Sequence, residues 1–152
     1  MKITADEVGY LPYAPKKAVS DGMSVFKVID VLKSAPVSCD VQVKEYGMDD
    51  NSGETVWQID FSDLQEPGSY CIEAQDGSRS AVFKIEPHVY RTMKNAMLKA
   101  FYFQRCGMDL EPSCATVFAH PACHLQSAHL YEDPSVTMEI RGGWHDAGDF
   151  GR

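Results

Sequence analysis

The chain has 152 residues, of which 44% are hydrophobic and 24% charged, and its 22 acidic and 14 basic residues give a formal net charge of -8. This ordinary globular composition excludes collagen, coiled coil and disorder of the whole chain. The acidic balance argues against nucleic acid and anionic membranes as partners, since both require a basic surface. No apolar run reaches the ~18 residues of a membrane span, and residues 1–7 lack the apolar core of a secretory signal. We expect a cytoplasmic protein, or a secreted one whose signal has been removed.

The first half of the chain, to about residue 86, alternates short apolar runs with turn residues. The runs cover residues 17–19, 26–32, 37–43, 55–61, 69–74 and 81–85. Period-two patterning with a turn about every ten residues predicts an immunoglobulin-like β-sandwich over residues 1–86. Leu64, Gly68 and Tyr70 also resemble a tyrosine corner, in which the hydroxyl bonds back to the preceding loop; a merely buried tyrosine is the alternative.

The pattern changes after Pro87. Val89, Met93, Met97 and Phe101 recur at helical spacing, and the predicted helix over 88–105 is apolar around most of its circumference. Such a helix belongs inside a larger helical body. Residues 108–143 show no sustained period, and long ordered loops of this kind are usually functional.

The cysteines number five, which does not suit a disulfide framework in a chain of this length. A single bridge between Cys39 and Cys71 is possible, because both fall in predicted strands. Free buried thiols are the alternative.

Two carboxylates, Asp146 and Asp149, lie close together near the end of the chain, with Gly148 between them. Glycine lets the backbone turn freely, so both groups can converge on one small target. A pair of this kind can hold and deprotonate a water molecule. A solvated acidic turn or a cation-binding loop explains the same spacing.

A second group combines thiols and imidazoles. Cys106, Cys123, His124 and His145 form a Cys2His2 set that suits tetrahedral zinc, although their spacing matches no common zinc finger. Other thiols and imidazoles compete for the same role; these are Cys114, His120 and His129. Free thiols and surface histidines remain the simpler reading.

At these residues the chain resembles glycoside hydrolase family 9, in the branch with an N-terminal immunoglobulin-like domain. The N-terminal part of the resemblance rests on segments 8–12, 16–18, 60–64 and 67–70. The C-terminal part rests on Lys99–Gly107, His120–His124 and the segment Gly142-Gly143-Trp144-His145-Asp146-Ala147-Gly148-Asp149. The last two motifs are highly specific in combination, and the resemblance covers essentially the whole chain.

The resemblance implies an enzyme that cleaves β-1,4-glucosidic bonds in cellulose or related β-glucans with inversion. Asp149 matches the general base that activates water, and Asp146 matches its partner in holding that water. Residues 88–152 match the opening helix and loop of an (α/α)6 catalytic barrel. The general acid of the family is a much later glutamate, so we expect it beyond Arg152 and expect these 152 residues alone to be inactive.

The resemblance also implies a structural zinc held by Cys106, Cys123, His124 and His145. Four protein ligands leave no open position for water, so the metal would have no catalytic role. His145 adjoins Asp146, and the metal would therefore anchor the catalytic loop to the end of the first helix.

Two other functions fit parts of the sequence. A non-catalytic module could bind glycans through surface aromatics, for which Tyr10, Tyr13 and Trp57 are the candidates. A family 9 exo-glycosidase could act on amino-sugar or short oligosaccharides, since the family includes such enzymes.

Overall fold

The computed structural model describes residues 1–145. The chain divides into two compact units, the first spanning Met1–Arg91 and the second beginning at Thr92. Among the described residues, no helix combines the length and apolar character needed to cross a bilayer.

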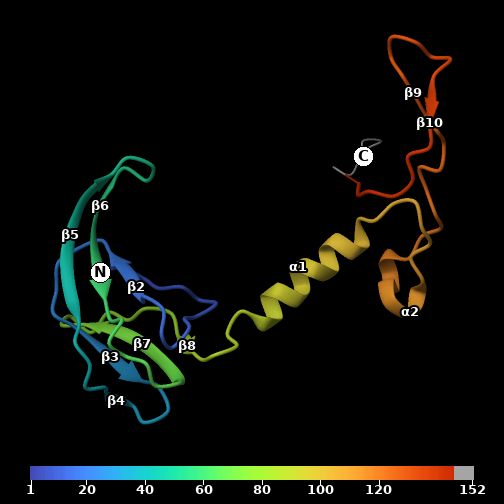
Figure 1. Cartoon of the computed structure of the whole chain (residues 1–152). Helices are drawn as coiled ribbons and strands as arrows, with labels where there is room; N and C mark the ends of the chain where they lie inside the picture. The colour runs from blue at the N-terminus through green and yellow to red at the C-terminus, as the bar shows by residue number, and fades with distance from the viewer. Residues whose placement is uncertain (146–152) are drawn as a thin grey trace. The chain divides into compact units, whose positions relative to one another are not determined.

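The first unit is a sandwich of two antiparallel four-stranded sheets, with strand orders β1-β2-β6-β5 and β4-β3-β7-β8 (Figure 1). The strands are β1 Ile3–Thr4, β2 Lys17–Ser20, β3 Phe26–Asp30, β4 Ala35–Pro36, β5 Gln42–Asp49, β6 Glu54–Asp60, β7 Gly68–Ala74 and β8 Phe83–Ile85. The pairs β2/β6 and β3/β7 join strands that are far apart in the sequence. The sandwich predicted from the period-two pattern is confirmed.

Three aromatic rings form the centre of the sandwich core. The Tyr10 ring lies 5.2 Å from both Phe61 and Phe83, edge-on to each, and these two phenylalanine rings are 5.3 Å apart. The Tyr10 hydroxyl donates to the carbonyl of Lys17 at 2.7 Å, which satisfies its only polar atom inside the core. Tyr10 is therefore a core residue, and the suggestion that it lies on a glycan-binding surface was wrong.

The tyrosine corner is confirmed. The Tyr70 hydroxyl donates to the carbonyl of Glu66 at 3.1 Å, and the Tyr70 ring is buried. A side chain at Gly68 would have its Cβ 2.6 Å from that hydroxyl, so a glycine is needed where the loop passes the ring.

The strand predicted over 37–43 is formed only at residues 42–43, where β5 begins. Residues 37–41 instead link β4, which pairs with β3 in one sheet, to β5, which pairs with β6 in the other. Alternate residues of 37–43 pack against the core while the chain crosses between the sheets; they are Val37, Cys39, Val41 and Val43. Period-two patterning reports alternate burial of an extended chain, with or without a ladder partner.

The second unit contains helix α1, Arg91–Phe103, then α2, Pro112–Ala115, a 3-10 turn at Thr116–Phe118, and the two-residue strands β9, Ala128–His129, and β10, Thr137–Met138. No residue of α1 is buried, and four of its apolar side chains are 43–61% exposed; they are Met93, Met97, Leu98 and Phe101. The predicted helix over 88–105 was too long at both ends. At its start, Val89 is buried and the Tyr90 hydroxyl donates to the carbonyl of Gly9 at 2.8 Å, so both belong to the first unit.

Candidate metal centre

The Cys/His residues lie on three segments of the second unit that backbone hydrogen bonds hold together. The Cys106-Gly107 segment lies between the other two. The Gly107 amide donates to the carbonyl of Cys123 at 3.0 Å, and the Cys106 amide donates to the carbonyl of Gly143 at 3.2 Å. Residues far apart in the sequence are thus aligned by main-chain hydrogen bonds.

The last segment is held by a further pair of contacts. The His145 amide donates to the carbonyl of Gln104 at 2.7 Å, and Arg105 and Trp144 form an antiparallel bridge. The Arg105 guanidinium also lies 5.8 Å from the centre of the Trp144 ring. His145 is therefore placed by the residues directly after helix α1.

Glycines allow these backbones to approach closely. Gly107 has φ +80°, and a Cβ there would lie 2.4 Å from the Gly142 nitrogen. Gly142 and Gly143 also have positive φ, at +91° and +101°. Helix α1 ends earlier, at Phe103, so Gly107 is required by the contact with Gly142 and not by the helix end.

The metal-ligating atoms of Cys106, His124 and His145 all lie within 4.8 Å of one another. Cys106 is fully buried, at 0% exposure, and the two histidines are half-buried. Cys123 adjoins the group, with its sulfur 3.1 Å from His145 Nε2. The structure therefore brings Cys106, His124 and His145 together and places Cys123 beside His145.

The donor set fits zinc better than a hard cation. Thiolate sulfur and imidazole nitrogen are the ligands that zinc prefers, and no carboxylate joins the group among the described residues. Tetrahedral zinc with ordinary bond lengths separates its ligand atoms by about 3.3–3.8 Å. In the structure the Cys106, His124 and His145 ligand atoms lie within 4.8 Å of one another, and the Cys123 sulfur lies 3.1 Å from His145 Nε2.

The competing candidates lie outside this group. Cys114 is exposed, and its sulfur lies 3.8 Å from the Ser113 hydroxyl. His129 is on β9, with Nδ1 3.0 Å from the carbonyl of Pro134. His120 is nearer, with its ring 5.8 Å from that of His145, but its Nδ1 lies 2.8 Å from the Pro121 carbonyl.

The carboxylates Asp146 and Asp149 lie outside the described residues. The structure does describe their neighbour His145, so the start of the motif is placed at the metal centre. The thiols of Cys39 and Cys71 are free, and the suggested bridge between them is absent.

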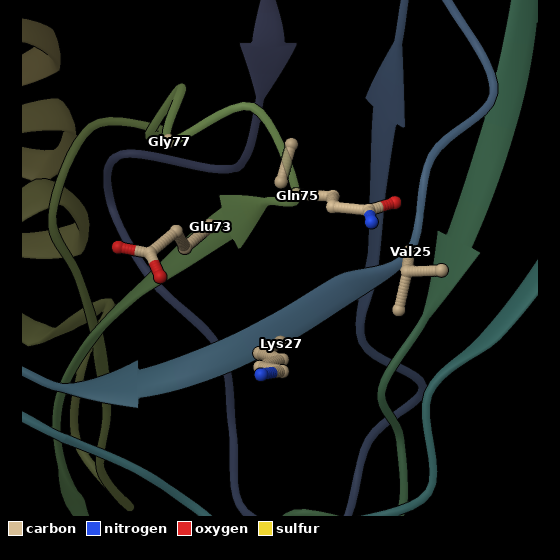
Figure 2. Close-up of a pocket in the computed structure, with 6 residues that line it drawn as sticks. Val25, Lys27, Glu73, Gln75 and Gly77 are labelled. Atoms are coloured by element: carbon tan, nitrogen blue, oxygen red, sulfur yellow. The ribbon is translucent and has the colours of Figure 1, made fainter.

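A surface cavity of about 330 Å³ lies at the β3–β7 end of the first unit (Figure 2). Val25, Lys27, Glu73 and Gln75 are among its lining residues, and none of the lining residues is aromatic. Glu73 is engaged by Arg79 at 2.6 Å. The cavity therefore lacks a stacking surface for a sugar ring, and Tyr13, an aromatic residue named as a glycan-binding candidate, is 86% exposed and lies outside its lining.

Known families match both parts of the chain. Residues 1–79 match the cellulase N-terminal ig-like domain, and residues 90–152 match glycosyl hydrolase family 9. The chain belongs to glycoside hydrolase family 9. Its sandwich is accordingly the immunoglobulin-like domain found at the N-terminus of cellulases in this family.

Characterised relatives extend well beyond the region that this family 9 chain covers. A cellodextrinase from Butyrivibrio fibrisolvens is 38% identical over 152 residues, which are 99% of this chain and 27% of that protein. The structure of AaCel9A in complex with cellobiose-like isofagomine matches with a TM-score of 0.75 and 27% identity, over 99% of this chain and 27% of that one. A Zn-binding triple mutant of the family 9 endoglucanase J30 matches with a TM-score of 0.71 and 34% identity, over 92% of this chain and 27% of that one.

Proposed function

We propose that the whole protein is an inverting O-glycosyl hydrolase that cleaves β-1,4-glucosidic bonds in cellulose or related β-glucans. Membership of family 9 supports this activity. The observation that carries it is the convergence of four Cys/His side chains at the residue directly before Asp146. A non-catalytic binding module would not need a group of Cys and His ligands directly before an acidic motif.

Asp149 is the proposed general base, and Asp146 its partner in holding the attacking water. An inverting glycosidase separates its two carboxyl groups by about 6.5–9.5 Å, which leaves room for water on the far side of the bond. The second carboxyl group, the general acid, is proposed to come from the part of the protein that the relatives have beyond this region. The 152 residues alone are then expected to show no turnover, because losing one half of the acid–base pair costs about 10²–10⁴-fold.

Cys106, Cys123, His124 and His145 are the proposed ligands of a structural zinc. When bound, the metal would cross-link the segment after α1 to the loop that carries the catalytic aspartates. The chain's own contribution is the set of backbone hydrogen bonds that aligns these segments. For catalysis, this cross-link would place Asp146 and Asp149 precisely.

Residues 1–86 are proposed as the immunoglobulin-like domain and residues 88–152 as the opening of an (α/α)6 barrel. The exposure of apolar side chains on α1 supports the second assignment; they are Met93, Met97, Leu98 and Phe101. A helix with this surface is suited to packing against further helices.

Short cello-oligosaccharides are a second candidate substrate class. The relative with 38% identity over the chain is named a cellodextrinase, which favours this class over amino-sugar substrates. Product analysis of the full-length protein on cellohexaose and on carboxymethylcellulose would distinguish cleavage within a polymer from action on short oligosaccharides. A fall in viscosity of the polymer indicates internal cleavage, whereas release of short products without such a fall indicates action on oligosaccharides.

Metal analysis of the full-length protein and its cysteine variants tests the site. We expect one zinc per chain, loss of the metal in Cys106→Ser and Cys123→Ser, and retention in Cys114→Ser, which has the same chemical change at an exposed thiol. Asp149→Ala should retain zinc while losing activity. Loss of metal from Cys114→Ser but not from Cys106→Ser would show that the ligand set is wrong.

A further inference from the structure

The loop that carries Cys123 and His124 pairs irregularly with the segment that follows Cys106. The Gly107 amide donates to the Cys123 carbonyl at 3.0 Å, and the Leu110 amide donates to the His120 carbonyl at 2.9 Å. Leu110 is buried, at 2% exposure, so this end of the pairing is fixed by packing. Between these two hydrogen bonds, a side chain joins the two segments.

That side chain is Asp109. Its Oδ1 accepts a hydrogen bond from the Ala122 amide at 2.7 Å. Ala122 directly precedes Cys123, and His124 follows in a left-handed conformation with φ +53°. Asp109 therefore fixes the peptide directly before Cys123 and His124, the two proposed metal ligands on this loop.

Asp109 is not itself a member of the Cys/His group. Asp109 is exposed, and its carboxylate bonds to the backbone of the loop. Residues that hold metal ligands in place commonly change metal affinity about 10–100-fold when they are removed. The contact thus has the position and the chemistry of a support for the ligands.

We propose that Asp109 is a positioning residue that sets the loop of Cys123 and His124 for metal binding. This inference rests on the proposed zinc site. The contact is a single hydrogen bond from a backbone amide to the Asp109 side chain. The proposal therefore predicts that a hydrogen-bond acceptor is needed at position 109, whereas a negative charge is not.

Zinc competition with a chromophoric chelator tests the proposal on the full-length protein. Asp109→Ala should weaken zinc binding about 10–100-fold, and Asp109→Asn, which retains the Oδ1 acceptor, should stay within about threefold of the wild type. Asp133→Ala is the matched control, because Asp133 is also exposed and accepts its bonds within its own turn from Ser135. It should bind zinc like the wild type.

A second readout follows the loop without the metal. Hydrogen exchange at the Ala122 amide should be faster in metal-free Asp109→Ala than in the metal-free wild type and Asp109→Asn. Wild-type zinc affinity in Asp109→Ala, or equal weakening in both Asp109 variants, would overturn the positioning role. A wild-type protein that binds no zinc would instead overturn the proposed metal site.

Discussion

Gly107→Ala should loosen the metal centre through the backbone, without altering any ligand. The new Cβ would lie 2.4 Å from the Gly142 nitrogen and 2.7 Å from its Cα, so the two segments must separate. Separation would break the two backbone bonds that join these segments, from the Cys106 amide to Gly143 and from the His145 amide to Gln104. Each such bond contributes about 1 kcal/mol. The positive φ of +80° costs an alanine about 1–2 kcal/mol more.

Gly142→Ala is the matched control for this substitution. Gly142 has a similar φ of +91°, but a Cβ there would meet no atom within 4 Å. It should therefore incur the conformational cost alone. The difference between the variants is the loss of two hydrogen bonds, about 2 kcal/mol, which corresponds to about 30-fold in zinc affinity.

The assay is zinc competition with a chelator, performed side by side on the wild type and both glycine variants. We expect both variants to bind more weakly than the wild type, with Gly107→Ala the weaker by about 30-fold. Equal affinities for the two variants would refute the reasoning, because they would show that the close approach of the backbones does not hold the ligands together.

Three further predictions concern the first unit. Tyr70→Phe should lower the free energy of unfolding in urea by about 1 kcal/mol, because it removes only the hydroxyl hydrogen bond of the tyrosine corner; an unchanged midpoint would contradict this. Burial lowers the pKa of Lys16, so the unfolded chain binds more protons than the folded one between the folded pKa and the ordinary value. Stability should consequently rise with pH over that window, and Lys16→Met should lose the rise in pH-dependent urea melts; the same slope in both proteins would exclude Lys16 as its source. A chain of residues 1–91 should melt at a higher temperature than residues 1–86, since it retains buried Val89, and equal melting temperatures would argue against this extension.

Local patterning carried much of the information about the first unit. Alternating apolar residues located most of the strands, and the Gly68–Tyr70 spacing identified the tyrosine corner. The same signal failed over 37–41, because alternate burial does not require a ladder partner. It also missed β5 beyond Val43, where an exposed strand with a bulge between Glu45 and Gly47 has no alternating apolar face.

The residue types showed which side chains could bind a metal, but not which of these side chains lie together in the fold. Cys106, Cys123, His124 and His145 stood out as soft ligands, yet from residue types alone Cys114, His120 and His129 remained open. Only the tertiary structure separates them, because backbone bonds between distant segments bring Cys106 and His145 to the Cys123 loop while leaving Cys114 exposed. Asp109 gave no signal in the sequence, since an acceptor for a distant amide has no characteristic spacing; its role depends on a contact across 13 residues that the fold alone creates.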